Sequence, residues 1–477
     1  MGRGVGGLHQ SDDAGELEGT GTRPSKGGPC QRELLEGNMP DAKTSERVFT
    51  GLQKVVDRAR KHPGEKIFSL AHRIDEPALA RAYQRLRNDA AVGVDGVTKA
   101  EYGRDFERRL ADLHERLRTK RWRHQPIRRV HIAKGEGKTR PIGISTVEDK
   151  MVQDAVREVL EAVYEQDFLA CSYGFRPGRK AHDALRALHR AVYQGEANWI
   201  IEADIVSFFD SLDRSKLREM LRKRVGDESL MRLIGKCLHV GVLDGEEYSE
   251  PAVGTAQGSV LSPHLGNVYL HEVLDGWFEH EIRPRLRGKA CLIRYADDFV
   301  IGFEHHDDAE RVMAVLPKRM GRYGLTLHPD KTRLLPFGKP KGGGGKGPAI
   351  LDFLGFRLYW RRTRQGSWRV GCKTRPARLR RAIRAATEYC RSHRHDPVKE
   401  QHAALTRQIR GHLNYFAVNG NSRSLWMLVR TTERAWHYWL RRRSQRTSLT
   451  WERYKALLGC YPLPAPRITV QIWGALP

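Results

Sequence analysis

Helical periodicity dominates the two ends of the chain. Apolar side chains recur every three to four residues over 45–121, over 147–168 and from 375 onwards, and this spacing predicts helices with one buried face. Helical regions are therefore expected on both sides of the middle of the chain.

Short apolar runs in the middle of the chain predict β-strands instead. They lie at 200–206, 291–295 and 299–303 and are too short for helices. A further strand pair is predicted at 130–140, where a Gly-rich basic turn separates two extended segments. The fold class that this order predicts is α+β.

Two segments lack any periodicity. Residues 1–45 are polar and Gly-rich and predict a disordered N-terminal arm. The stretch KPKGGGGKGP at 339–348 predicts a flexible loop.

The composition adds a large core and a basic surface. Hydrophobic residues make up 39% of the 477 residues, and 84 Lys and Arg stand against 57 Asp and Glu, a net charge of +27. No apolar run reaches about 18 residues and no secretory signal pattern is present, so we expect a soluble cytoplasmic protein without a membrane partner. The cysteines form no CxxC pair, which argues against a disulfide framework and a cysteine zinc site.

The positive charge is concentrated near the end of the sequence. Residues 361–477 hold 25 Lys and Arg against 5 Asp and Glu, together with six of the ten tryptophans. Arginine with aromatic residues is typical of surfaces that contact phosphates and stack on bases. A solvated basic face over an ordinary core is the alternative for any single residue, but the regional excess favours nucleic acid.

The clearest chemical signal is the pair Asp297 and Asp298, which lies between two predicted strands. Adjacent carboxylates repel one another and raise each other's pKa unless a cation is present. Two Mg²⁺ ions would relieve this repulsion and supply what phosphoryl transfer needs. A third acid is required from a neighbouring strand, and Asp204, at the end of the 200–206 strand, is the candidate.

These residues lie within a series of motifs that resembles the reverse transcriptases encoded by bacterial group II introns, also called intron maturases. The motifs, in the order of that family, are GVDG at 93–96, RRV at 128–130 leading to Lys134, KTRP at 138–141, SYGFRPGR at 172–179, the strand end at 204–210, GTAQG at 254–258, YADD at 295–298, DKT at 330–332, FLGF at 353–356 and RGHLNYF at 410–416.

The resemblance implies a right-hand polymerase with fingers, an antiparallel palm sheet and a helical C-terminal thumb or maturase region. The implied division is an N-terminal extension with fingers over 46–199, the palm over 200–360 and the thumb over 361–477. An RNA-directed DNA polymerase is then expected, which binds its group II intron RNA, assists splicing and copies the intron into cDNA during mobility.

The same resemblance assigns the catalytic centre. It implies that Asp204, Asp297 and Asp298 hold two Mg²⁺ ions, assisted by the backbone carbonyl of Ile205. Lys331 is a candidate for protonating the pyrophosphate, although a purely electrostatic role is equally open.

Nucleotide-binding residues are implied in three other motifs. Lys134 and Arg140 resemble residues that grip the incoming triphosphate, which suits an ammonium and a guanidinium. Gln257 resembles the glutamine that faces the incoming sugar, and Phe209 the aromatic gate that favours deoxynucleotides. One of Phe208 and Phe209 is expected to be a core residue.

The implied partners are intron RNA, an RNA template with a DNA primer, dNTPs and target DNA, which would bring a bacterial protein to the nucleoid. Candidate nucleic-acid contacts are Arg128, Arg129, Gly355, Arg441, Arg442 and Arg443. The family's C-terminal HNH nuclease, with its paired cysteines, is expected to be absent. Two alternatives stay open: a splicing-only RNA-binding maturase with an idle polymerase fold, and a domesticated reverse transcriptase in defence or repair.

Overall fold

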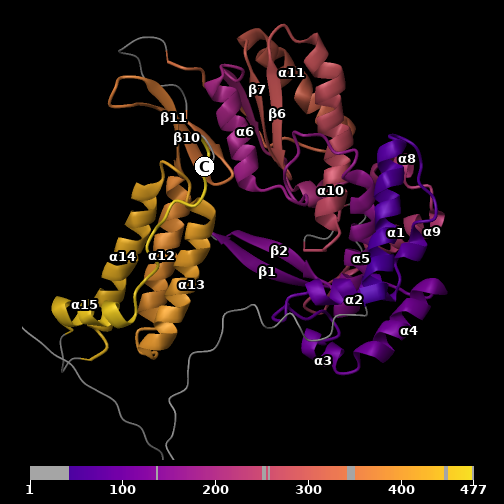
Figure 1. Ribbon diagram of the computed structural model, residues 1–477, viewed down its shortest axis with the longest axis horizontal. Helices are drawn as coiled ribbons and strands as arrows, with labels where there is room; N and C mark the ends of the chain where they lie inside the picture. The colour runs from indigo at the N-terminus through magenta and orange to yellow at the C-terminus, as the bar shows by residue number, and fades with distance from the viewer. Residues whose placement is uncertain are drawn as a thin grey trace, which may run out of the picture. The chain divides into compact units, whose positions relative to one another are not determined.

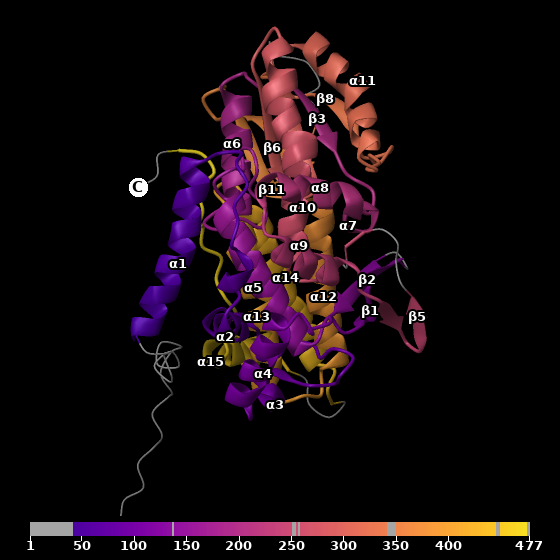
Figure 2. The ribbon, with the colours of Figure 1, turned by 90° about the vertical axis from the view of Figure 1, so that its right-hand side faces the viewer.

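The computed structural model describes residues 42–135, 138–249, 254–255, 258–340, 350–444 and 449–474. Residues Val48–Pro477 form one compact unit, and the description below concerns this unit. Figure 1 and Figure 2 show its elements in two views.

A four-stranded antiparallel sheet occupies the middle of the sequence, in the order β6-β7-β3-β8. Its strands are β3 (Trp199–Ala203), β6 (Ala290–Tyr295), β7 (Asp298–Phe303) and β8 (Arg333–Pro336). The strands predicted at 291–295 and 299–303 are thus confirmed, and so is the antiparallel sheet. The strand predicted over 200–206 ends earlier, because Ile205 leaves the sheet and bridges Leu327.

This sheet is buried on both faces. Side chains alternate between the faces of a strand, and Ile200 belongs to one hydrophobic cluster while its neighbour Ile201 belongs to another. Helix α6 (Ala181–Tyr193) covers one face and α11 (His306–Arg322) the other (Figure 1). The strands of this sheet are therefore packed between helices on both faces.

The part before β3 contains a helical layer and the β1–β2 hairpin, which confirms the strand pair predicted at 130–140. This hairpin belongs to a second sheet of order β2-β1-β4-β5, whose strands β4 (Val242–Asp244) and β5 (Glu247–Ser249) come after β3 in the chain. Helix α5 begins with a cap in which the Thr146 side chain accepts from the Asp149 N–H. The elements before β3 are α1 (Ala42–Lys61), α2 (Glu76–Arg85), α3 (Lys99–Gly103), α4 (Phe106–Arg118), β1 (Ile127–Gly135), β2 (Lys138–Ile144) and α5 (Val147–Tyr164).

Short helices connect β3 to β6. Two consecutive π-helical segments follow α10 and carry the chain towards β6. In order, these elements are α7 (Phe208–Ser211), α8 (Arg214–Arg224), α9 (Glu228–Leu238), β4 (Val242–Asp244), β5 (Glu247–Ser249), α10 (Ser262–Leu270) and the π-helical segments His271–Asp275 and Trp277–Ile282.

The final part combines a three-stranded sheet with helices, as the periodicity beyond 375 predicts. The buried Trp436 indole donates to Gln401 Oε1 at 2.9 Å and joins two of the helices. Its elements are β9 (Leu351–Phe353), β10 (Phe356–Arg362), β11 (Trp368–Thr374), α12 (Pro376–Ser392), α13 (Val398–Phe416), α14 (Ser422–Leu440) and α15 (Trp451–Cys460).

Two of the predicted segments lie largely outside the described residues, and one predicted boundary falls inside a strand. Most of the predicted arm, 1–45, lies outside the described residues, and α1 begins at Ala42. Most of the predicted loop at 339–348 also lies outside them. A boundary at 360/361 would fall inside β10, which pairs with β11 along its length.

No helix in the described ranges is both long enough and apolar enough to cross a membrane.

Candidate active site

Two neighbouring strands bring the three predicted acids together. Ala203 pairs with Phe299 in the register of β3 and β7, so Asp204 and Asp298 follow at the next positions of the two strands. Asp297 precedes Asp298 in the turn that closes the β6–β7 hairpin. The structure therefore places all three aspartates at one end of the sheet.

The acids influence one another electrostatically. Burial raises the pKa of Asp297, and the charge of Asp204 raises it further. Part of the Asp298 side chain is open to solvent, yet the surrounding protein removes enough water to raise its pKa to about 6, with Asp297 and Asp204 adding to the effect. Like charges held together in this way favour a bound cation.

A buried ion pair supports the turn from behind. Arg294 and Asp275 are fully buried and form a bidentate pair, with Nε donating to Oδ1 at 2.7 Å and Nη2 to Oδ2 at 2.6 Å. Arg294 also donates to Asn267 Oδ1, to Ser172 Oγ and to the carbonyl of Ala296 in the turn itself. The turn backbone is thus fixed by a guanidinium whose donors are shared among four partners.

The turn conformation needs this support, because Ala296 has a φ of 57°. A residue other than glycine is strained in that region of backbone space. Gly174 of the SYGFRPGR motif lies against the turn, and a Cβ there would come within 2.3 Å of the Ala296 nitrogen. The glycine is required because the backbones approach so closely.

Lys331 reaches the same site. Its ammonium pairs with Asp204 Oδ2, and its charge lowers the pKa of Asp298. Among the described residues, no backbone N–H outside the regular helices and strands donates to the carbonyl of Ile205. The position of Lys331 agrees with the predicted one, while its chemical role stays a prediction.

The donor set fits divalent cations. Carboxylate and carbonyl oxygens are the ligands that Mg²⁺ takes in proteins. The three aspartates are spaced more widely than the ligands of one closed site: in the part of the chain that the structure describes, only His306, Asp307 and Glu310 bring ligand atoms within 4.8 Å of one another. Those three lie at the partly exposed start of α11, where acids commonly stand without a metal.

Magnesium should stabilise the protein in a manner that depends on Asp298. The raised pKa means that stability from this group is present below about pH 4 and is lost as the pH rises through about 6. At pH 7 the ionised acids repel, so added Mg²⁺ should raise the melting temperature. Scanning fluorimetry with and without Mg²⁺ checks this, and Asp298→Asn should reduce the increase. An equal increase in the variant would contradict the prediction.

The β1–β2 hairpin brings Arg140 towards the acids. The Arg140 charge lowers the pKa of both Asp297 and Asp210, although burial raises each overall. Lys134 lies on β1 close to the hairpin turn, and its side chain is outside the described part.

A segment after β5 joins this hairpin to α7. Gly254 lies against the backbone of Asp210, and Gly258 lies against β2, where a Cβ would meet the Gly143 carbonyl at 2.4 Å. Gln257 falls between them and is outside the described residues. Phe208 is buried and Phe209 partly buried, which confirms that one of the pair is a core residue.

The predicted contacts at the start of β1 already have protein partners. Arg128 donates to the carbonyl of Val92 at 3.0 and 2.7 Å, and Arg129 lies 3.8 Å from Asp244. Their contact with nucleic acid stays a prediction.

Gly355 lies in a two-residue hairpin turn between β9 and β10. Leu354 and Gly355 both have positive φ, 50° and 78°, the pattern of a type I′ turn. Tyr415 of α13 donates to the Leu354 carbonyl at 2.9 Å. The charge of Arg378, on α12, lowers the pKa of Asp298, so this turn and the start of α12 lie near the acids.

The three arginines predicted as RNA contacts differ in their surroundings. Arg441 and Arg442 are exposed, and Arg442 stacks over Tyr438 at 3.7 Å. Arg443 donates to the carbonyls of His395 and Asp396 at 2.8 Å each, which gives it a structural role.

Several residues of the site were not predicted from the sequence. No motif near Asp275 or Asn267 predicts their role, because these residues are distant from Arg294 in the sequence and contact it only in the folded protein. Arg378 was one arginine among many in a basic region. A signal did exist on α14: Trp426, Arg430, Arg434 and Tyr438 recur every four residues and form one helix face, and Arg442 continues this spacing just beyond the helix.

Comparisons with known proteins show the family of the chain. The family described as reverse transcriptase (RNA-dependent DNA polymerase) matches residues 132–358. YkfC of Escherichia coli (strain K12) is 32% identical over 358 residues, which cover 67% of this chain and 90% of YkfC.

Proteins of introns are also similar. The group II intron-encoded protein LtrA of Lactococcus lactis subsp. cremoris is 37% identical over 193 residues, 40% of this chain and 32% of LtrA. Nuclear intron maturase 2, mitochondrial, of Arabidopsis thaliana is 31% identical over 230 residues, 40% of this chain and 29% of that protein. The chain belongs to the reverse transcriptases, the RNA-dependent DNA polymerases, and resembles the members that group II introns encode.

Proposed function

We propose that this chain copies group II intron RNA into cDNA, binds that RNA and assists its splicing. The observation that carries the polymerase part is the convergence of Asp204, Asp297 and Asp298 at one sheet end, with Lys331 beside them. In the proposed right-hand arrangement, residues 46–199 include the fingers, 200–360 the palm and 361–477 the thumb. The β9–β10 turn then lies at the end of the palm, just before the thumb.

The chemistry is nucleotidyl transfer in which two Mg²⁺ ions would activate a primer 3′-hydroxyl and neutralise the leaving pyrophosphate. Asp204, Asp297, Asp298 and the Ile205 carbonyl would hold these ions. The Arg294 network keeps the Asp297 backbone in place, and Lys331 supplies a positive charge close to Asp204 and would donate a proton to the pyrophosphate. These residues orient the reacting groups in advance.

The incoming dNTP would lie between the β1–β2 hairpin and α7. Arg140 already acts electrostatically on Asp297, which supports a place for the triphosphate between guanidinium and acids. Lys134 would add a second cation. Phe209, packed against Gly266 beside the buried Phe208, would limit the space at the sugar, and Gln257 would face the same sugar.

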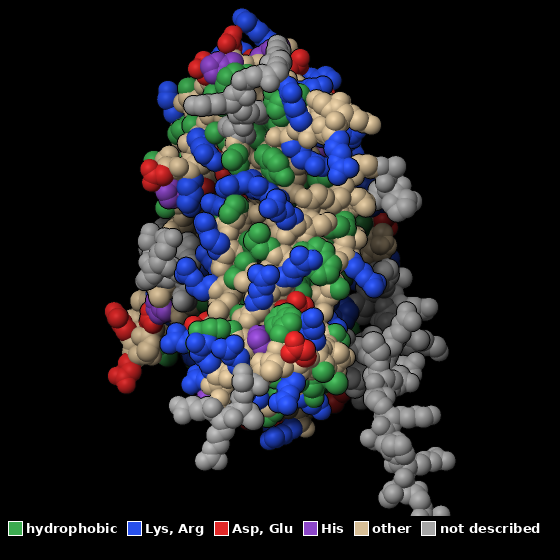
Figure 3. Space-filling model, turned by 90° about the vertical axis from the view of Figure 1, so that its left-hand side faces the viewer, with side chains coloured by type: hydrophobic (Ala, Val, Ile, Leu, Met, Phe, Trp, Pro, Cys, Tyr) green, Lys and Arg blue, Asp and Glu red, His purple; other side chains and the backbone are tan. Residues whose placement is uncertain are grey.

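An exposed basic face on α14 supports RNA binding. Figure 3 shows the side of the molecule on which α14 lies in Figure 1, and Lys and Arg clearly outnumber Asp and Glu there. Arg430 lies over the exposed Trp426 at 5.4 Å, so guanidinium and ring offer phosphate contact and base stacking together. Intron RNA, the template–primer duplex and target DNA are the proposed ligands, and action on DNA would place the protein at the nucleoid.

Neutralising this face should flatten the salt dependence of RNA binding. Changing Arg430 and Arg434 of this face, together with the exposed Arg441 directly after α14, to Gln should reduce the slope of log K against log salt by about 2 to 3, since each lost phosphate contact removes about 0.7 to 0.9. Binding titrations of intron RNA at several salt concentrations measure the slope.

The matched control changes three other exposed arginines, Arg87, Arg108 and Arg118, whose charges are balanced by neighbouring acids. It should leave the slope nearly unchanged. Equal slopes for both triple variants would contradict an RNA interface on α14.

Two assays separate the proposal from its alternatives. Primer extension on an RNA template tests the polymerase, and absence of extension would favour a splicing-only maturase. Splicing of the cognate intron at low Mg²⁺, with and without the protein, tests the maturase role. Extension without any effect on splicing would favour a domesticated reverse transcriptase.

A further inference from the structure

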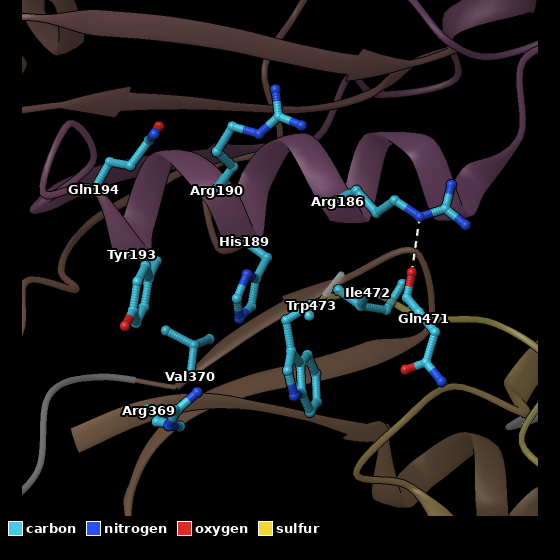
Figure 4. A pocket seen from close by; sticks show the side chains of 11 residues that line it. Arg186, His189, Arg190, Tyr193, Gln194, Arg369, Val370, Gln471, Ile472 and Trp473 are labelled. Atoms are coloured by element: carbon cyan, nitrogen blue, oxygen red, sulfur yellow. Dashed lines mark hydrogen bonds between the residues drawn. The ribbon is translucent and has the colours of Figure 1, made fainter. Parts of the chain in front are cut away.

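A pocket outside the aspartate site lies between α6, β11 and the segment 471–474 (Figure 4). Its volume is about 360 Å³, and none of the catalytic acids lines it. Helix α6 contributes His189 and Tyr193, β11 contributes Val370, and the last described segment contributes Ile472 and Trp473. The pocket therefore joins three parts of the sequence that are far apart.

Three rings in this pocket lie nearly parallel. The His189 ring is 5.2 Å from Trp473 at an interplanar angle of 20°, and 6.1 Å from Tyr193 at 9°. Burial lowers the pKa of His189, so the imidazole is neutral at pH 7 and stacks as an uncharged ring. Tyr193 is 56% exposed, which leaves an aromatic surface of the series accessible.

The fold fixes the segment that carries Trp473. Asn419 donates from Nδ2 to the Trp473 carbonyl at 2.8 Å and accepts at Oδ1 from the Ile472 N–H at 2.9 Å. Arg186 of α6 donates to the Gln471 carbonyl at 2.8 Å, as the dashed line in Figure 4 shows. The ring series is thus held in place by the folded protein.

The charged side chains that line the pocket are all positive. Arg186, Arg190 and Arg369 line it together with polar and apolar residues, and no Asp or Glu does so. Arg186 is engaged with Asp183 and Gln471. Within the described ranges, Arg190 and Arg369 form no ion pair. In Figure 4 Arg369 lies on the same side of α6 as the rings and Arg190 extends from the opposite side, so a strand that passes Tyr193 would meet one cation on each side of the helix.

From these observations we propose that the pocket binds an unpaired nucleotide of single-stranded RNA. The base would extend the aromatic series at Tyr193, and the neighbouring phosphates would lie against Arg369 and Arg190. Every base has an aromatic face, so such a site would accept any of the four bases. A base that is paired within a duplex cannot reach it. This proposal rests on the proposed function in one respect, namely that the nucleic acid bound by the protein is RNA.

Photocrosslinking of the full chain tests the proposal directly. A short unstructured RNA carrying one 4-thiouridine is irradiated with the protein, and the crosslinked peptides are identified by mass spectrometry. A crosslink at Tyr193 or at a pocket residue beside it is expected, and annealing a complementary strand should remove it. Crosslinks confined to other regions, or an undiminished crosslink with duplex RNA, would overturn the proposal.

Two pairs of variants sharpen the result. Tyr193→Ala should lower the crosslink yield at the pocket residues by about tenfold, the effect of losing one base stack, and Tyr193→Phe should restore it. Arg190→Gln combined with Arg369→Gln should lower the yield more than Arg108→Gln combined with Arg118→Gln. Equal yields within either comparison would overturn the proposal.

Primer extension is measured on the unsubstituted protein from the same preparation, so that failure of the pocket proposal can be distinguished from failure of the proposed function. Active polymerase without the crosslink contradicts the pocket alone. A crosslink at the pocket without extension supports the pocket and contradicts the polymerase.

Discussion

Replacing Asp297 by Asn should abolish primer extension while making the metal-free protein more stable. The amide keeps the shape of the side chain but removes a metal ligand, and losing several kcal/mol of transition-state stabilisation lowers the rate by about 10³-fold or more. Stability should rise at pH 7, because the raised pKa of Asp297 shows that its charge opposes folding. Primer extension and chemical denaturation without Mg²⁺ measure the two effects.

The control for this variant is Asp307→Asn at the exposed start of α11. It should leave both extension and stability close to those of the parent. If Asp297→Asn extended primers at the parental rate, the assignment of the aspartate site would be wrong. If it lost activity and also stability, the acids would not repel one another as the structure indicates.

The second large effect is expected from Asp275→Ala. This change leaves the Arg294 guanidinium fully buried without its carboxylate, and breaking a buried pair in this way costs about 3–5 kcal/mol. Extension should also fall, because Arg294 holds the Ala296 carbonyl in the turn. Urea denaturation measures the free energy of unfolding.

Glu272→Ala is the matched control, since Glu272 lies in the same π-helical segment and pairs with Lys223 at the surface. An exposed pair contributes only about 0–1 kcal/mol. Equal losses for the two variants would contradict a special role of the buried pair. Asp275→Leu combined with Arg294→Met should recover much of the stability, because it removes both buried charges.

The sequence predicted what is encoded locally. The strands around Asp297 and Asp298, the helical C-terminal part and the place of Asp204 all follow from short apolar patterns and motif order. Alternation along β3 and β7 fixes which residues share a face, and this is sufficient to bring the acids to one end.

What could not be predicted depends on contacts between distant segments. Asp275 gains its importance only where the π-helical segments bring it to Arg294. The positive φ of Ala296 depends on contacts with Gly174 and Arg294, which no pattern near residue 296 reveals. The sequence does not separate Arg443 from its neighbours Arg441 and Arg442. Its structural role is visible only in its hydrogen bonds to two loop carbonyls.

The return of residues 470–473 to the body of the protein affects how the chain folds during synthesis. Arg186 and Gln471 are separated by 285 positions, and Val470 bridges Val418 only after both have been made. The hydrophobic cluster that contains residues of both α6 and Ile472 therefore cannot close until Ile472 has left the ribosome. Until then α6 exposes part of its apolar face, and nascent chains stalled shortly before residue 470 should be sensitive to protease at α6.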